Sequence, residues 1–135
     1  MKKVILFIAI FFSIECHAQE PKEILRSIYF GGGSYGIEQG QRQSLYKLLS
    51  EIPNIEFYEI SITSHTDNIG SRELNEYLSR MRSESVIQQL VRFKVPQELI
   101  RFKDYGFDAP VFDNETLRGR MRNRRVDILF TPIVL

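Results

Sequence analysis

A carboxylate and an arginine stand at positions from which they could hold a zwitterionic ligand. Asp67 lies in the turn HTDNIG (65–70), between a strand-like segment and a helix-like segment that contains Arg82. On a helical wheel, Arg82 falls near the middle of the arc that carries the apolar side chains. A guanidinium that faces inward is costly unless it is paired. We therefore expect Arg82 to face a carboxylate or a ligand, and Asp67 is the nearest candidate in the sequence.

Two interpretations of this pair stay open. In the first, Asp67 and Arg82 form a plain salt bridge that locks the turn against the helix. In the second, they line a partly open pocket in which the carboxylate takes a ligand ammonium and the guanidinium takes a ligand carboxylate. Gly70 relieves the tight turn, and Ser71 is a suitable N-cap. Neither interpretation contains a nucleophile or a general base, so the pair predicts binding rather than catalysis.

The hydrophobic pattern predicts the elements that position this pair. Apolar residues spaced i, i+3, i+4 and i+7 predict a helix over about 38–51, and a second helix runs from near Ser71 to about Phe93. Four strands and a short helical turn are predicted, at 24–30, 58–63, 99–105 and 126–131 and near 117–122. Strands separated by helices indicate an α+β fold, a two-layer βαβ-type sandwich with the helices mostly on one face.

Residues 1–18 have the pattern of a secretory signal peptide. Two lysines precede an apolar run over 4–14, which is too short for a bilayer span of about 20 residues. Cleavage is expected after Ala18. The alternatives are an uncleaved anchor and lipidation of Cys16, but Glu15 stands where a lipoprotein signal carries a small residue. Cleavage after Ala18 would remove the chain's single cysteine.

Composition and isolated motifs argue against several other functions. Without residues 1–18, basic and acidic side chains are equal in number, so no general attraction to a polyanion is expected. The stretch RGRMRNRR (118–125) carries five arginines, but the predicted export argues against a nucleic-acid site; Arg122 and Arg125 are expected to be solvated. His65 has no further His or Cys ligands in the mature chain, so a structural role is expected. We expect no enzyme, no metal and no cofactor.

A longer series of residues reproduces the order and spacing of a known family. It runs from about Ser27 to Phe130, nearly the whole predicted mature chain. The matching residues are His65, Thr66, Asp67, Gly70, Asn75, Leu78, Ser79, Arg82, Val86, Tyr105, Gly106, Pro110, Asn114, Arg120, Asn123, Arg124, Arg125 and Val126. In these residues the chain resembles the OmpA-like peptidoglycan-binding domain. The resemblance divides the chain into a signal peptide (1–18), a short tail that enters the first strand (19–26) and the domain itself (27–131).

The resemblance implies a four-stranded mixed sheet with helices packed against it. It also implies non-covalent binding of peptidoglycan through the diaminopimelate of the stem peptide. Asp67 would take the ammonium of that residue and Arg82 its carboxylate, while Asn75 would orient the pocket. Thr66 and Arg124 complete the ligand-binding set that the resemblance predicts. Gly33 stands where some members of the family carry a polar side chain.

In function, the resemblance implies cell-wall attachment or scaffolding in the periplasm, in association with the wall or the outer membrane. Peptidoglycan is the expected partner, an envelope membrane protein is a possible second one, and no nucleic acid is expected. The alternative is an OmpA-like protein–protein interaction module with weak or no peptidoglycan binding. The glycine-rich loop FGGGSYG (30–36) motivates this alternative, because it offers few side chains to a pocket.

Overall fold

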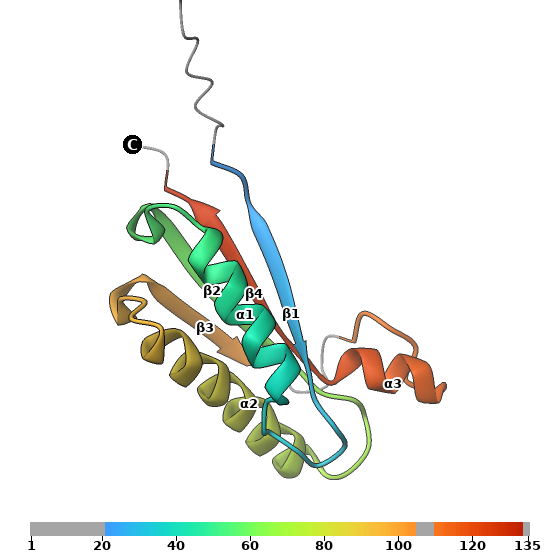
Figure 1. Cartoon of the computed structure of the whole chain (residues 1–135). Helices are drawn as coiled ribbons and strands as arrows, with labels where there is room; N and C mark the ends of the chain where they lie inside the picture. The colour runs from blue at the N-terminus through green and yellow to red at the C-terminus, as the bar shows by residue number, and fades with distance from the viewer. Residues whose placement is uncertain (1–20, 105–109, 134–135) are drawn as a thin grey trace, which may run out of the picture.

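The computed structural model describes residues 21–104 and 110–133 (Figure 1). The predicted signal peptide, Tyr105 and Gly106 lie outside these ranges. Each predicted strand and helix is present within a few residues of its expected ends. The elements, with two short 3₁₀ helices, are β1 (Ile24–Tyr29), α1 (Gln39–Glu51), η1 (Ile55–Phe57), β2 (Tyr58–His65), α2 (Arg72–Arg92), η2 (Gln97–Leu99), β3 (Ile100–Asp104), α3 (Leu117–Asn123) and β4 (Arg125–Pro132).

The strands form one mixed sheet in the order β1-β4-β2-β3. β4 runs antiparallel to both β1 and β2, and β3 runs parallel to β2. Helices α1 and α2 lie against one face of this sheet, whereas α3 lies beyond the ends of β1 and β4 (Figure 1). The predicted α+β class, the four-stranded mixed sheet and the placement of the helices mainly on one face are therefore confirmed.

The core lies between the sheet and the two long helices. Strand residues of one parity enter it, as the buried pair Ile62 and Ile128 shows, because side chains alternate across a strand. The helices contribute residues one turn apart, such as Leu45 with Leu49 and Val86 with Leu90. No helix in the described part of the chain is long and apolar enough to cross a membrane.

The buried stripe of α2 is polar along its first half. Leu78, Val86 and Leu90 are buried as the wheel predicts. The apolar residues at the two helix ends, Leu74 and Phe93, are by contrast 48% and 37% exposed. The polar residues buried along the same helix are Asn75, Ser79, Arg82, Ser83 and Gln89. A helix that buries a cation among amides and hydroxyls is presenting them to a polar partner, not to the apolar core.

Candidate ligand-binding site

The turn between β2 and α2 brings a carboxylate to the buried side of the helix. The Oδ1 atom of Asp67 accepts a hydrogen bond from the backbone N–H of Ile69 at 3.1 Å. Gly70 adopts a φ of +95°, a conformation that favours glycine. The hydroxyl of Ser71 caps α2 by accepting from the N–H of Leu74 at 3.1 Å. These contacts hold the Asp67 side chain where the end of β2 meets the start of α2, and it is 9% exposed there.

The ion-pair partner of Asp67 is Arg124. The Nη1 atom of Arg124 lies 2.9 Å from Oδ2 of Asp67, and its Nε donates to the carbonyl of Phe30 at 3.2 Å. The interpretation in which Asp67 and Arg82 form a plain salt bridge is therefore wrong. The reason is the sheet topology: β4 pairs with β2 so that Arg125 stands opposite His65, which places Arg124 beside the turn.

Arg82 is 1% exposed, and it is held by backbone carbonyls of the glycine-rich loop. Its Nε donates to Ser34 O at 2.8 Å and its Nη2 to Gly31 O at 3.0 Å. The guanidinium carbon also lies 5.3 Å from the centre of the Phe30 ring. Within the described residues, its third nitrogen, Nη1, has no hydrogen-bond partner. A buried donor of this kind is expected to find an acceptor, which leaves Arg82 with one strong hydrogen-bond donor for a ligand.

Burial governs the acid–base state of this arginine. Desolvation lowers the pKa of Arg82 to about 10, which the charge of Asp67 opposes and the charge of Arg124 reinforces. Arg82 therefore remains a cation at neutral pH. Two guanidinium groups and one carboxylate then share the site, so its local charge is positive.

Asn75 and Thr66 are both 1% exposed, but they occupy different places. The Nδ2 atom of Asn75 donates to Ile69 O at 3.0 Å and to Ser71 O at 3.1 Å, which ties the turn to the first part of α2. The Oγ1 atom of Thr66 has no partner within the described residues, and Thr66 does not line the pocket at this site. Asn75 does line it, from the helix side.

A pocket of about 220 Å³ joins these groups. Of the five residues that the sequence predicts, Asp67, Arg82, Asn75 and Arg124 border it. The remaining wall is built from glycines of the first loop and of the turn, and from apolar side chains of the turn and helix: Gly32, Gly33, Gly70, Ile69, Leu74 and Leu78. Sequence reasoning missed this apolar wall. In the structure, Ile69 and Leu74 are 61% and 48% exposed, and apolar side chains are unusual on the surface of a turn and a helix start. The pocket can accept an ammonium beside a carboxylate, with a short aliphatic chain on the apolar wall.

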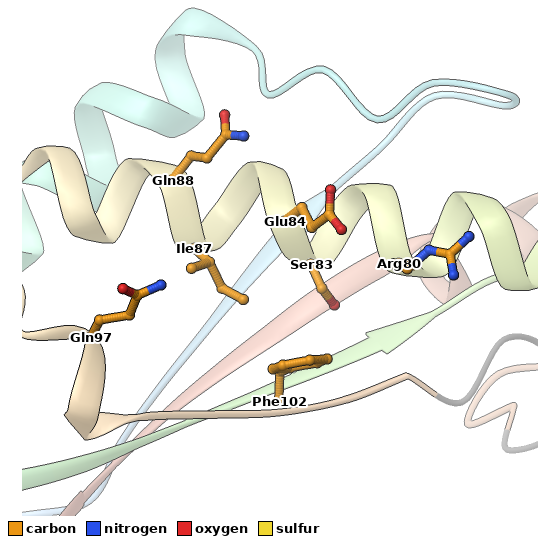
Figure 2. Close-up of a pocket in the computed structure, with 7 residues that line it drawn as sticks. All are labelled: Arg80, Ser83, Glu84, Ile87, Gln88, Gln97 and Phe102. Carbon is orange, nitrogen blue, oxygen red and sulfur yellow. The ribbon is translucent and has the colours of Figure 1, made fainter.

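A second hollow of about 320 Å³ lies between α2 and the edge strand β3. Figure 2 shows the ring of Phe102 facing Ile87 and Ser83 across it. Phe102 is 64% exposed, because the hollow separates its ring from α2. None of the predicted site residues borders this hollow. Within the described ranges, no group of three or more His, Cys, Asp or Glu side chains could hold a metal ion.

The open face of the sheet carries a compact charged cluster. The Nε atom of Arg125 lies 3.1 Å from both carboxylate oxygens of Asp127, and Ser27 donates to Oδ1 of Asp127 at 2.6 Å. His65 Nε2 lies 3.6 Å from the other oxygen of Asp127. Arg125 is 6% exposed, so the expectation that it is solvated is wrong: its strand position directs it into this cluster. Arg122 is exposed, as expected.

Comparison with known proteins identifies the family. The OmpA family model matches residues 29–124. The outer-membrane lipoprotein YfiB of Pseudomonas aeruginosa is 31% identical over 102 residues, which are 76% of this chain and 61% of that protein. The outer membrane protein Omp38 of Acinetobacter baumannii is 34% identical over 119 residues, which are 81% of this chain and 33% of that protein. The chain thus spans about three fifths of one relative and a third of the other.

Solved structures show the same fold. The peptidoglycan-associated lipoprotein of Burkholderia pseudomallei superposes with a TM-score of 0.73 at 25% identity, over 78% of this chain and 90% of that one. A periplasmic domain of Helicobacter pylori MotB superposes with a TM-score of 0.67 at 21% identity, over 86% and 80% of the two chains. With a family match over most of the described residues and the same mixed sheet in its structural relatives, the chain belongs to the OmpA family.

Proposed function

We propose that this chain binds peptidoglycan non-covalently through the diaminopimelate of the stem peptide, and that it serves as a wall-attachment or scaffolding domain in the periplasm. The observation that carries the proposal is the pocket in which the buried, partly unpaired guanidinium of Arg82 faces the same space as the Asp67–Arg124 pair. A relative of the same fold is a peptidoglycan-associated lipoprotein, and two others are outer-membrane proteins, which supports a place in the cell envelope.

The ligand ammonium is assigned to Asp67. Oδ1 of Asp67 accepts a hydrogen bond from the N–H of Ile69, and Oδ2 accepts one from Arg124. Because a carboxylate oxygen offers two lone-pair directions, each oxygen retains one acceptor site for an ammonium. Asp67 can therefore bind a ligand without giving up the ion pair that fixes it.

The ligand carboxylate is assigned to Nη1 of Arg82, with Arg124 adding to the field. Charge-assisted bonds between guanidinium and carboxylate are among the stronger hydrogen bonds in proteins. The excess of positive charge gives the pocket a selectivity: a ligand with an ammonium alone meets repulsion, whereas a ligand with an ammonium and a carboxylate does not. Diaminopimelate carries both groups at its free end, whereas the lysine that replaces it in other walls carries only the amine.

The test is co-sedimentation of the protein with isolated sacculi. The protein is expressed from the full chain and purified after its export. Diaminopimelate-type sacculi are expected to pellet the protein, and lysine-type sacculi are expected to leave it in solution. Phe102→Ala, in the hollow of Figure 2, is a matched control that should bind like the unchanged protein. Equal binding to both wall types would refute the assignment of the carboxylate to Arg82. Absence of binding to both would favour the alternative of a protein–protein interaction module.

A further inference from the structure

We infer that a second subsite, on the far side of Arg124, receives the acidic residue to which the diamino acid is bonded in the stem peptide. This inference rests on the proposed function and extends it. The observation behind it is a hollow of about 500 Å³ between the end of β1, the start of α1 and α3. The residues that line it are Tyr29, Phe30, Gly31, Glu38, Gln41, Met121, Arg122 and Arg124.

This hollow adjoins the candidate pocket at Arg124. Arg124 borders both, and Gly31 lies next to the pocket glycines Gly32 and Gly33. The guanidinium of Arg124 is fixed between them, since its Nη1 binds Asp67 and its Nε binds the carbonyl of Phe30. A diamino acid held by its free end in the first pocket carries the rest of the peptide at its other end. We therefore place that peptide across Arg124, in the second hollow.

The charge of the second hollow suits a carboxylate. Arg122 and Arg124 are its cations and Glu38 is its one anion. Within the described residues, Arg122 has no ion-pair partner, and its guanidinium carbon lies 3.9 Å from the centre of the Phe112 ring. Stacking of this kind uses the flat face of a guanidinium and leaves its N–H edge available. Arg122 is thus held in place by an aromatic ring while its donors remain open to a ligand.

The other walls limit what can bind there. The side-chain amide of Gln41 is already used, because it both accepts from Tyr29 N and donates to Tyr29 O at 2.8 Å. Tyr29 and Met121 are 44% and 52% exposed and give the hollow an apolar side. A small residue with one carboxylate matches this combination of open arginine and apolar wall. In the stem peptide that residue is the γ-linked glutamate, whose α-carboxylate is free.

The experiment compares two synthetic peptides, L-Ala–γ-D-Glu–diaminopimelate and the same peptide with the glutamate α-carboxylate amidated. Their affinities are measured by calorimetry at low ionic strength for the unchanged protein, for Arg122→Gln, and for Arg118→Gln. Arg118 is an exposed arginine of the same helix that does not border the hollow, so it is the matched control. The unchanged protein and Arg118→Gln should prefer the acidic peptide by roughly twofold to fivefold, as expected for an exposed ion pair. Arg122→Gln should bind both peptides equally.

The outcomes separate the two proposals. If the unchanged protein binds both peptides with equal affinity, the second subsite is refuted while the diaminopimelate pocket stands. If Arg122→Gln keeps the preference, the subsite is also refuted. If the unchanged protein binds neither peptide, the proposed function itself fails and the subsite fails with it. Because Arg122 is exposed, the glutamine variant is expected to fold, which a circular dichroism spectrum checks.

Discussion

Replacing Arg82 with methionine should abolish wall binding at a modest cost in stability. Methionine is unbranched, flexible and uncharged, so it fills the space of the aliphatic part of the arginine and leaves a smaller cavity than alanine would. The substitution removes the hydrogen bonds to Ser34 O and Gly31 O, at 2.8 and 3.0 Å. It also removes the donor Nη1 that is assigned to the ligand carboxylate. The same change therefore tests a structural and a binding role, which must be measured separately.

The structural cost is the difference between opposing terms. A buried carbonyl left without a donor costs about 1–3 kcal/mol, but Gly31 lies in an exposed loop where water can replace the arginine. The substitution also removes the cost of burying the charged guanidinium of Arg82, which offsets part of the loss of these hydrogen bonds. We expect a net loss of about 1–2 kcal/mol in the free energy of unfolding, or a fall in Tm of about 4–8 °C.

The binding cost is larger. Removing one partner of a hydrogen-bonded charge pair at an interface costs about 2–5 kcal/mol, which corresponds to a loss of affinity of roughly 30-fold or more. Sedimentation with diaminopimelate-type sacculi, over a range of sacculus concentrations and well below the Tm of the variant, measures it. A folded Arg82→Met protein that binds sacculi as tightly as the unchanged protein would refute the assignment of Arg82 to the ligand.

Three further predictions concern charge, packing and pH. Asp67→Asn keeps an acceptor for Ile69 N but leaves Arg124 unpaired, so it should lower the free energy of unfolding by about 3 kcal/mol and abolish sacculus binding; denaturant unfolding beside sedimentation measures both, and unchanged binding would contradict it. Gly119→Ala should lower the free energy of unfolding by about 3 kcal/mol or more, because an added Cβ would lie 1.7 Å from the backbone oxygen of Asp113. Gly40→Ala, whose added Cβ would meet nothing within 4 Å, should be neutral or slightly stabilising. Thermal unfolding of both variants measures the difference. The pKa of Arg82 is about 10 in the folded chain and higher in the unfolded one, so above pH 10 the unfolded chain binds more protons. The free energy of unfolding of the unchanged protein, measured relative to that of Arg82→Met, should therefore rise there by up to about 1.4 kcal/mol per pH unit. Denaturant titrations at pH 8 and pH 11 measure this difference, and a flat difference would contradict the burial of the charge.

The turn that carries Asp67 could be read from the sequence because its determinants are local. Gly70 supplies the positive φ, and Ser71 caps α2 through the N–H three residues on. The inward position of Arg82 follows from helical periodicity alone, since its angle on the wheel is set by its place in the helix. These features depend on residues within one turn of each other, and short-range chemistry is what a single sequence records best.

The partners of these groups were not accessible in the same way. Arg124 lies 57 positions from Asp67 in the chain, and only the pairing of β4 with β2 places the two side chains 2.9 Å apart. Charge alone made Arg82 an equally reasonable partner for that carboxylate. The ligands of Arg82 were hidden for another reason: Gly31 and Ser34 bind it through backbone carbonyls, which every residue possesses and which therefore leave no mark on the sequence.

By itself, then, the sequence determined the order of strands and helices, the turn, the inward arginine and the family resemblance, because these depend on periodicity and on residue types at fixed spacing. The tertiary structure decided which arginine neutralises Asp67, that Thr66 is buried away from the pocket, and that Arg125 joins Asp127 on the open face of the sheet. The outcomes for Arg124 and Arg125 depend on the register of β4 against its neighbours. A register is fixed by the packing of the whole core, so no single segment of the chain encodes it.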